Sequence, residues 1–83
     1  MVRSFSYKVE ATDDRGIART REFTVIARDH AEAREEIDAV FSMHEVIESW
    51  RIAQVLGVKD LPPEDAFAKD YAAKGAHSYY ESL

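Results

Sequence analysis

Cysteine is absent from this chain of 83 residues. Disulfides therefore cannot stabilise the fold, and neither a thiolate metal site nor thiol catalysis is available. No apolar run approaches the ~18 residues that a membrane-spanning helix needs. The first residues alternate in polarity and lack the apolar region of a signal peptide. We therefore expect a cytoplasmic protein with no membrane partner.

Glycine and proline are also scarce, with three and two residues, so neither a Gly-rich phosphate loop nor a G-x-S-x-G nucleophile motif can be found. His44 begins the run His-Glu-Val-Ile-Glu, which resembles the zinc-binding HExxH motif. Glutamate stands where that motif needs its second histidine, one helical turn from the first. We therefore predict that the chain is not an enzyme, with no catalytic residues, no metal site and no cofactor.

Charge is distributed unevenly along the chain, whose net charge is −5. Residues 1–28 contain six Lys or Arg and four Asp or Glu, a net charge of +2. Residues 29–83 contain five Lys or Arg and twelve Asp or Glu, a net charge of −7. The two parts together give the net charge of −5. Opposite charges on two parts of one small domain, residues 1–83, favour an interaction surface over a catalytic site.

The N-terminal part has the pattern of a β-hairpin. Residues 2–12 alternate between apolar and polar, as in a strand with one solvent-facing side. Asp-Asp-Arg-Gly at 13–16 predicts a type I turn followed by the glycine of a G1 bulge, and so a three-residue loop. This loop pairs residues whose numbers sum to thirty and places Lys8 opposite Glu22. We predict a hairpin over residues 2–27 with one apolar face.

Residues 29–42 change to a helical period. Asp29 is a suitable N-cap, and Glu32 occupies the third helical position, as in a capping box. The apolar stripe contains Ala33, Ile37, Val40, Phe41 and His44. We predict an amphipathic helix that packs on the apolar face of the hairpin.

Residues 45–56 fit two interpretations, because they are rich in β-branched and aromatic residues but also match helical spacing. We predict a strand, since a hairpin with a single helix has a poor core. A right-handed crossover places this strand antiparallel to the first strand, in the order 3-1-2.

A short helix is predicted over 63–74, with Gly75 at its C′ position and an aperiodic tail over 75–83. The predicted fold is α+β, a three-stranded antiparallel ββαβ sheet with one helix packed on it and a short C-terminal helix.

Three groups of side chains are candidates for binding a partner. The basic hairpin could contact phosphates or carboxylates and consists of Arg15, Arg19 and Arg21. The acidic face could occupy a basic surface and consists of Asp29, Glu32, Glu35, Glu36 and Asp38. The aromatic tail has more aromatic area than a short helix needs and consists of Phe67, Tyr71, Tyr79 and Tyr80. Each group also has a structural interpretation: local ion pairs, a solvated helix and closure of the core.

The run from Phe23 to Ala33 leads from a strand into a helix through an acidic N-cap and an alanine-rich first turn. In this feature and the ββαβ outline, residues 2–56 resemble small proteins of phages and mobile elements, among them anti-CRISPR proteins. The resemblance implies a non-catalytic inhibitor that occludes a basic protein surface. It transfers no site residues to this chain.

We therefore expect a small acidic interaction module that binds and occludes a protein partner, such as a complex that handles nucleic acid. One alternative is a nucleic-acid-binding module that uses the basic hairpin, whose binding would be sensitive to salt. Another is a homo-oligomeric structural protein, such as a homodimer, assembled through the strand at 45–56 or through Tyr79 and Tyr80.

Overall fold

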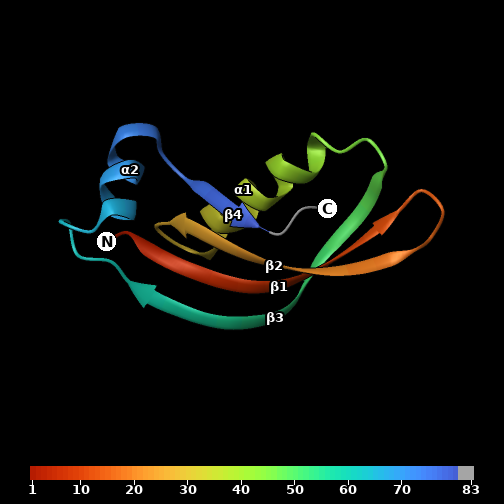
Figure 1. The fold of residues 1–83 in the computed structure, drawn as a ribbon, viewed down its shortest axis with the longest axis horizontal. Coiled ribbons are helices and arrows are strands. Elements are labelled where there is room, and N and C mark those ends of the chain that lie inside the picture. The colour runs from red at the N-terminus through yellow and green to blue at the C-terminus, as the bar shows by residue number, and fades with distance from the viewer. Residues whose placement is uncertain (81–83) are drawn as a thin grey trace.

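The computed structural model describes residues 1–80, and these form one four-stranded sheet and two helices (Figure 1). The elements are β1 (Arg3–Asp13), β2 (Ala18–Ala27), α1 (His30–Ser42), β3 (Ile47–Asp60), α2 (Ala66–Lys74) and β4 (His77–Tyr80). Their order in the sheet is β3-β1-β2-β4, and every neighbouring pair is antiparallel. The predicted α+β class is confirmed, but the sheet has four strands rather than three. Within residues 1–80, no helix has the length and apolar character to span a membrane.

The predicted hairpin is confirmed in loop and in register. β1 and β2 pair so that the numbers of opposed residues sum to thirty, which puts Lys8 across from Glu22. The N–H of Gly16 donates to the carbonyl of Asp13 at 3.0 Å, and Gly16 has a φ of 81°, a value that glycine adopts without steric cost. The Asp13 carboxylate also accepts hydrogen bonds from the N–H groups of Arg15 and Ile17, each at 2.9 Å. These contacts fix the loop at one end of a molecule that measures 44 × 23 × 21 Å.

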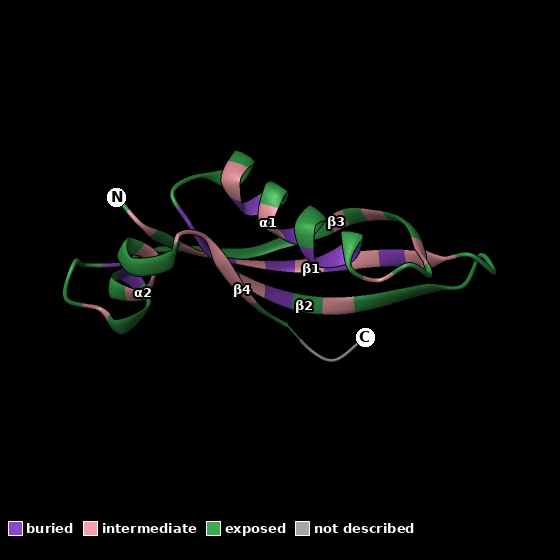
Figure 2. Ribbon diagram, turned by 90° about the horizontal axis from the view of Figure 1, so that it is seen from above, coloured by how far each residue is buried: buried purple, intermediate pink, exposed green. Residues whose placement is uncertain are grey.

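Helix α1 covers one face of the sheet, as predicted (Figure 2). Its N-cap is Asp29, whose carboxylate accepts from the N–H of Glu32 at 2.8 Å. The core between helix and sheet contains Phe5, Tyr7, Val9, Ala11, Phe23, Val25, Ala27, Ala33, Ile37, Val40 and Phe41. The opposite side of β1 carries serine, lysine, glutamate and threonine, so this strand has one apolar and one polar side.

The segment after α1 is a strand rather than a continued helix, but its bounds are 47–60 and not 45–56. The strand continues past residue 56, because Gly57 pairs with Ser6 and the ladder extends until Asp60 meets Arg3. The register between β1 and β3 shifts at three places, so β3 contains bulges that lengthen and twist it. This strand lies at the edge of the sheet and follows the strong curve visible in Figure 1.

The C-terminal part departs most from the prediction. Helix α2 begins at Ala66 rather than at residue 63, because the Asp65 carboxylate caps it by accepting from the N–H of Phe67 at 2.8 Å. It ends at Gly75, with a φ of 82°, as predicted. The prediction of an aperiodic tail over 75–83 is wrong for residues 77–80, which form β4 on the outer edge of β2. Its last residues, 81–83, lie outside the described part of the chain.

Helix α2 stands at the end of the sheet that is opposite the hairpin loop (Figure 1). There Ile26, Leu61 and Ala68 form a second buried cluster, with Val2 and Tyr71 packed against it. None of these five residues belongs to α1. At the other end, the hairpin loop is joined to the turn before β3, where the N–H of Asp14 donates to the carbonyl of Val46.

Candidate functional site

The acidic face is largely engaged inside the molecule. Asp29 caps α1, as described above. Asp38 accepts from the indole N–H of Trp50 at 3.0 Å, and Glu36 accepts from the hydroxyl of Ser78 at 3.3 Å. Glu35 is exposed and makes no hydrogen bond or ion pair with another residue of 1–80. Of the five predicted carboxylates, Glu35 alone is thus left for a partner without loss of an internal contact.

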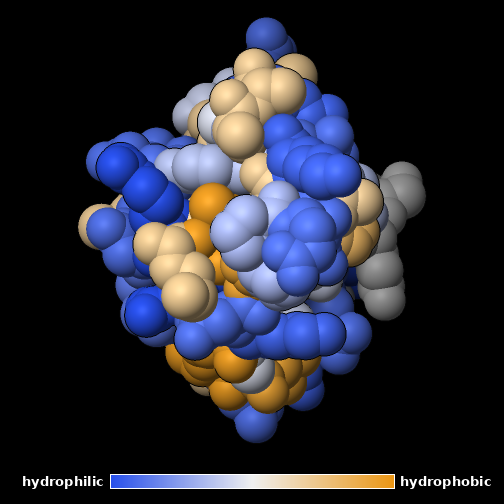
Figure 3. All heavy atoms as spheres, turned by 90° about the vertical axis from the view of Figure 1, so that its left-hand side faces the viewer, coloured by the Kyte–Doolittle hydropathy of each residue, from blue (hydrophilic) through white to orange (hydrophobic). Residues whose placement is uncertain are grey.

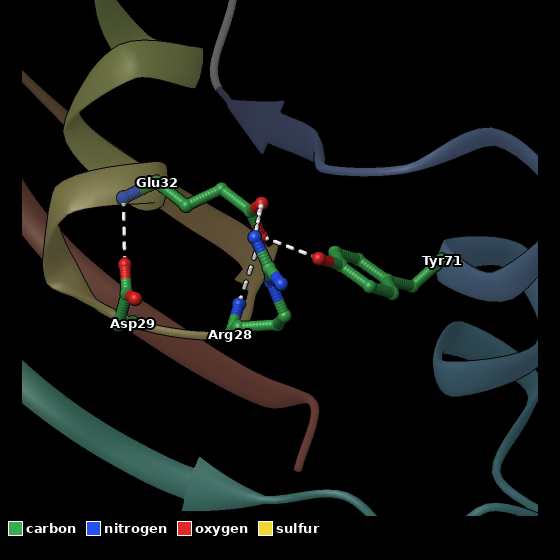
Figure 4. A network of polar contacts seen from close by, with 4 residues as sticks. All are labelled: Arg28, Asp29, Glu32 and Tyr71. Carbon is green, nitrogen blue, oxygen red and sulfur yellow. Dashed lines mark hydrogen bonds and ion pairs between the residues drawn. The ribbon is translucent and has the colours of Figure 1, made fainter.

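Glu32 is the centre of a polar network that joins α1 to α2 (Figure 4). One oxygen accepts from the N–H of Arg28 at 2.9 Å and from the hydroxyl of Tyr71 at 2.7 Å, and the other lies 3.2 Å from the Arg28 guanidinium. Burial disfavours the charged form of this carboxyl, but the Tyr71 and Arg28 contacts outweigh it, so the pKa of Glu32 is lowered. The pKa of Tyr71 is raised by burial and by its bond to the carboxylate. This network stabilises the fold, and we assign it no chemistry.

The aromatic tail closes the side of the sheet. Tyr80 stacks on Phe23 with ring centroids 4.9 Å apart, and Tyr79 meets Phe67 edge to face at 5.3 Å. Phe67, Tyr79 and Tyr80 remain between 42% and 46% exposed. The structural interpretation of these rings is thus supported by their contacts with one another and with the core.

Tyr7 is buried beneath α1, with its hydroxyl 2.7 Å from Nδ1 of His30. Burial raises the pKa of Tyr7 to about 12, although the charge of Arg34 opposes the shift. The phenol therefore stays protonated at neutral pH and serves as a polar contact inside the core.

The basic hairpin lines a hollow at the loop end of the sheet, with a volume of about 230 Å³. The hairpin contributes Ala11, Asp13, Arg15, Ile17 and Arg19, and the segment that enters β3 contributes His44, Val46 and Ile47. Arg19 is exposed and makes no hydrogen bond or ion pair with the other described residues. Arg15 is 69% exposed, with its guanidinium 3.5 Å from the Asp13 carboxylate. Arg21 lies outside this lining, and its guanidinium donates to the carbonyl of Thr20 at 2.8 Å.

Apolar side chains are exposed around the same hollow. Two apolar residues of its lining are exposed, Ile17 by 44% and Val46 by 56%. The turn is fixed to the hairpin because the N–H of Asp14 donates to the carbonyl of Val46 at 2.9 Å. Exposed apolar side chains that gather on a fixed frame mark an interaction site more often than scattered ones do.

Asp13 is the one carboxylate in the lining. Its hydrogen bond from the N–H of Ile17 lowers the pKa of this carboxyl, together with the N–H and the guanidinium of Arg15, while burial opposes the shift. The negative charge of Asp13 is thus compensated by hydrogen bonds from the N–H groups of Arg15 and Ile17 in the loop. Arg19 and the outer side of Arg15 supply the positive charge that a partner would meet.

The sequence predicted a basic hairpin of Arg15, Arg19 and Arg21, of which the first two line the hollow. It did not identify Ile17, Val46 and His44 as members of the same site. The strand order contained the signal. If β3 runs antiparallel to β1, its first residues must lie beside the last residues of β1, and hence beside the hairpin loop. The turn before β3 is therefore brought to Ile17 by topology.

A second hollow lies at the α2 end and is more apolar, bordered by Met1, Val2, Leu61, Pro63, Ala68, Lys69 and Ala72. Figure 3 looks at this end and shows apolar atoms between hydrophilic surroundings. Lys69 is the one charged residue in this lining, so the hollow does not define the charge of an occupant. Across residues 1–80, histidines and carboxylates form no group of three that could hold a metal ion.

Comparison with known proteins adds no relative: no family model, no curated protein and no solved structure matches the chain.

Proposed function

We propose that this chain is a non-enzymatic module that binds a protein partner, and that the partner sits in the hollow between the hairpin loop and the turn before β3. The observation that carries the proposal is the combination of exposed Ile17 and Val46 with the available guanidinium groups of Arg15 and Arg19. Arginine is enriched at protein interfaces, where apolar area supplies binding energy and charge supplies specificity.

A protein surface suits this hollow better than nucleic acid does. Phosphates would gain nothing from Ile17 and Val46, and no Phe, Tyr or Trp is present in the lining to stack on a base. Asp13 and Asp14 in the same loop would also repel a phosphate backbone.

An enzyme is disfavoured by the same lining, which has one histidine but no serine, threonine, cysteine or lysine to act as a nucleophile beside it. The acidic face is the weaker candidate for partner binding, because most of its carboxylates would have to leave an internal contact. The resemblance of residues 2–56 to phage inhibitors extends the proposal: occupation of the partner's surface would block that partner.

Photo-crosslinking in the cells that produce the protein tests this proposal. Benzoylphenylalanine in place of Val46 should yield a discrete adduct that survives nuclease treatment and is lost in the Arg15→Ala/Arg19→Ala variant. The matched position is Glu35, which is also exposed but lies on the acidic face, and it should yield no such adduct. An adduct that nuclease digests would favour the nucleic-acid alternative. An adduct from position 35 and none from position 46 would overturn the placement of the site, and its mass-spectrometric identity would test the inhibitor extension.

A further inference from the structure

We infer that the hollow at the hairpin loop recognises a protein segment in which a carboxylate side chain, Asp or Glu, is flanked by an apolar side chain. This inference rests on the proposed function and adds the chemistry of the partner. It follows from the two kinds of group that border the hollow, which are guanidinium and aliphatic.

The guanidinium groups define the charge of the occupant. Arg19 has no partner within residues 1–80, and Arg15 holds Asp13 with one nitrogen at 3.5 Å. A planar guanidinium that keeps free N–H donors binds a carboxylate with two parallel hydrogen bonds, which lysine cannot do. Asp13 does not occupy both arginines. Its Oδ1 already accepts two main-chain N–H bonds at 2.9 Å, and only its Oδ2 contacts Arg15.

The aliphatic groups define the neighbour of that carboxylate. Ile17 lies two residues before Arg19 on the hairpin, and Val46 faces it from the turn, so both border the hollow with the two arginines. Ile17 and Val46 are about half exposed and gain free energy when apolar atoms cover them.

The charge of the whole molecule also favours binding of such a segment at the hollow. The chain has a net charge of −5, so a strongly acidic partner would be repelled over most of its surface. The hollow is a local exception, and a partner that presents one carboxylate within an apolar segment meets attraction there without repulsion elsewhere. This combination limits binding to the loop end of the sheet.

The test uses three peptides and amide NMR of the isotopically labelled full chain. The probe is Ac-Gly-Ser-Leu-Glu-Leu-Gly-Ser-NH2, and its analogues carry Gln or Lys at the centre. The Glu peptide should shift amides of residues 11–19 and 43–47, whereas the Gln analogue should bind about fivefold more weakly, the worth of one exposed ion pair. The Lys analogue should bind more weakly still.

Variants assign the effect to the arginines. Arg15→Ala/Arg19→Ala should bind the Glu and Gln peptides equally, and its dispersed amide spectrum would report that it is folded. Lys59→Ala/Lys69→Ala removes the same charge at the far end of the molecule and should bind as the natural chain does.

Equal binding of the Glu and Gln peptides by the natural chain, or shifts away from the hollow, would overturn this inference. A protein adduct at position 46 would still leave the proposed function standing. Stronger shifts of the same amides by an oligothymidylate would overturn the inference of a carboxylate ligand in favour of phosphate recognition.

Discussion

The hydroxyl of Tyr71 lies 2.7 Å from the carboxylate of Glu32, and this hydrogen bond joins α2 to the first turn of α1 across 39 positions of the sequence. Glu32 also accepts the N–H of Arg28 at the end of β2. One side chain therefore connects the helix on the face of the sheet, the strand that precedes it and the helix at the end of the sheet.

Tyr71→Phe should show what this connection contributes to stability. The ring would keep its place in the second apolar cluster, while the carboxylate would lose one donor. We expect the free energy of unfolding in urea to fall by about 1.5–3 kcal/mol, as for a hydrogen bond to a charged group. Tyr79→Phe is the matched control, because the Tyr79 hydroxyl has no hydrogen bond to residues 1–80, and it should change stability by less than about 0.5 kcal/mol. Equal losses in the two variants would refute the assignment.

The lowered pKa of Glu32 predicts a dependence of stability on pH. The folded state holds this carboxyl charged at a pH where the unfolded chain, with a Glu pKa of about 4.3, already binds a proton. The stabilisation is therefore complete above the unfolded pKa and is lost as the pH falls through the folded pKa. The difference in unfolding free energy between the natural chain and Glu32→Gln should shrink between pH 5 and pH 3. Glu35→Gln, at an exposed site, should show no such trend, and a constant difference for Glu32→Gln would contradict the prediction.

Substitution by alanine should have opposite effects on stability at Gly16 and at Gly57. Apart from its two neighbours in the chain, neither glycine has another residue within 4 Å of the position that a Cβ would take, but only Gly16 of the two has a positive φ. Gly16→Ala should therefore cost about 1–2 kcal/mol through backbone strain alone. Gly57→Ala should be neutral or should stabilise the protein by up to about 1 kcal/mol, since it restricts the unfolded chain. Thermal unfolding of the two variants checks this, and a larger loss for Gly57→Ala would contradict the role of the loop.

The edge strand β3 predicts the oligomeric state. Val55, Leu56 and Val58 are 50%, 42% and 48% exposed along it, which resembles a dimerisation edge. The three register shifts, however, interrupt its ladder, and bulges of this kind protect natural edges from pairing with a second copy. We expect light scattering to give a monomeric mass at high micromolar concentration, unchanged in Val55→Lys. A dimer that Val55→Lys dissociates would establish the homo-oligomer instead.

The hairpin could be predicted closely because its determinants are local. Gly16 permits the bulge, the loop length sets the register, and the period of two then places Phe5 and Val25 on one face. The N-cap Asp29 and the apolar stripe of α1 are determined within a few residues in the same way.

The C-terminal strand could not be predicted from its own residues. His77 to Tyr80 contain no alternation that distinguishes them from a loop, and they are a strand because the outer edge of β2 between Phe23 and Ile26 was left open for them. The length of β3 is also a tertiary result, since the edge of β1 extends the strand past Gly57.

The candidate site shows the same division. Composition and pattern by themselves established an α+β domain without cysteine, a hairpin with arginines near its loop and an acidic helix. The tertiary structure decided that the acids of the helix contact Arg28, Tyr71, Trp50 and Ser78, and that the turn at Val46 is joined to the hairpin loop at Asp14. The reason is that charge and periodicity depend on neighbours in the chain, whereas the partner of a carboxylate or the opposite wall of a hollow comes from a residue tens of positions away.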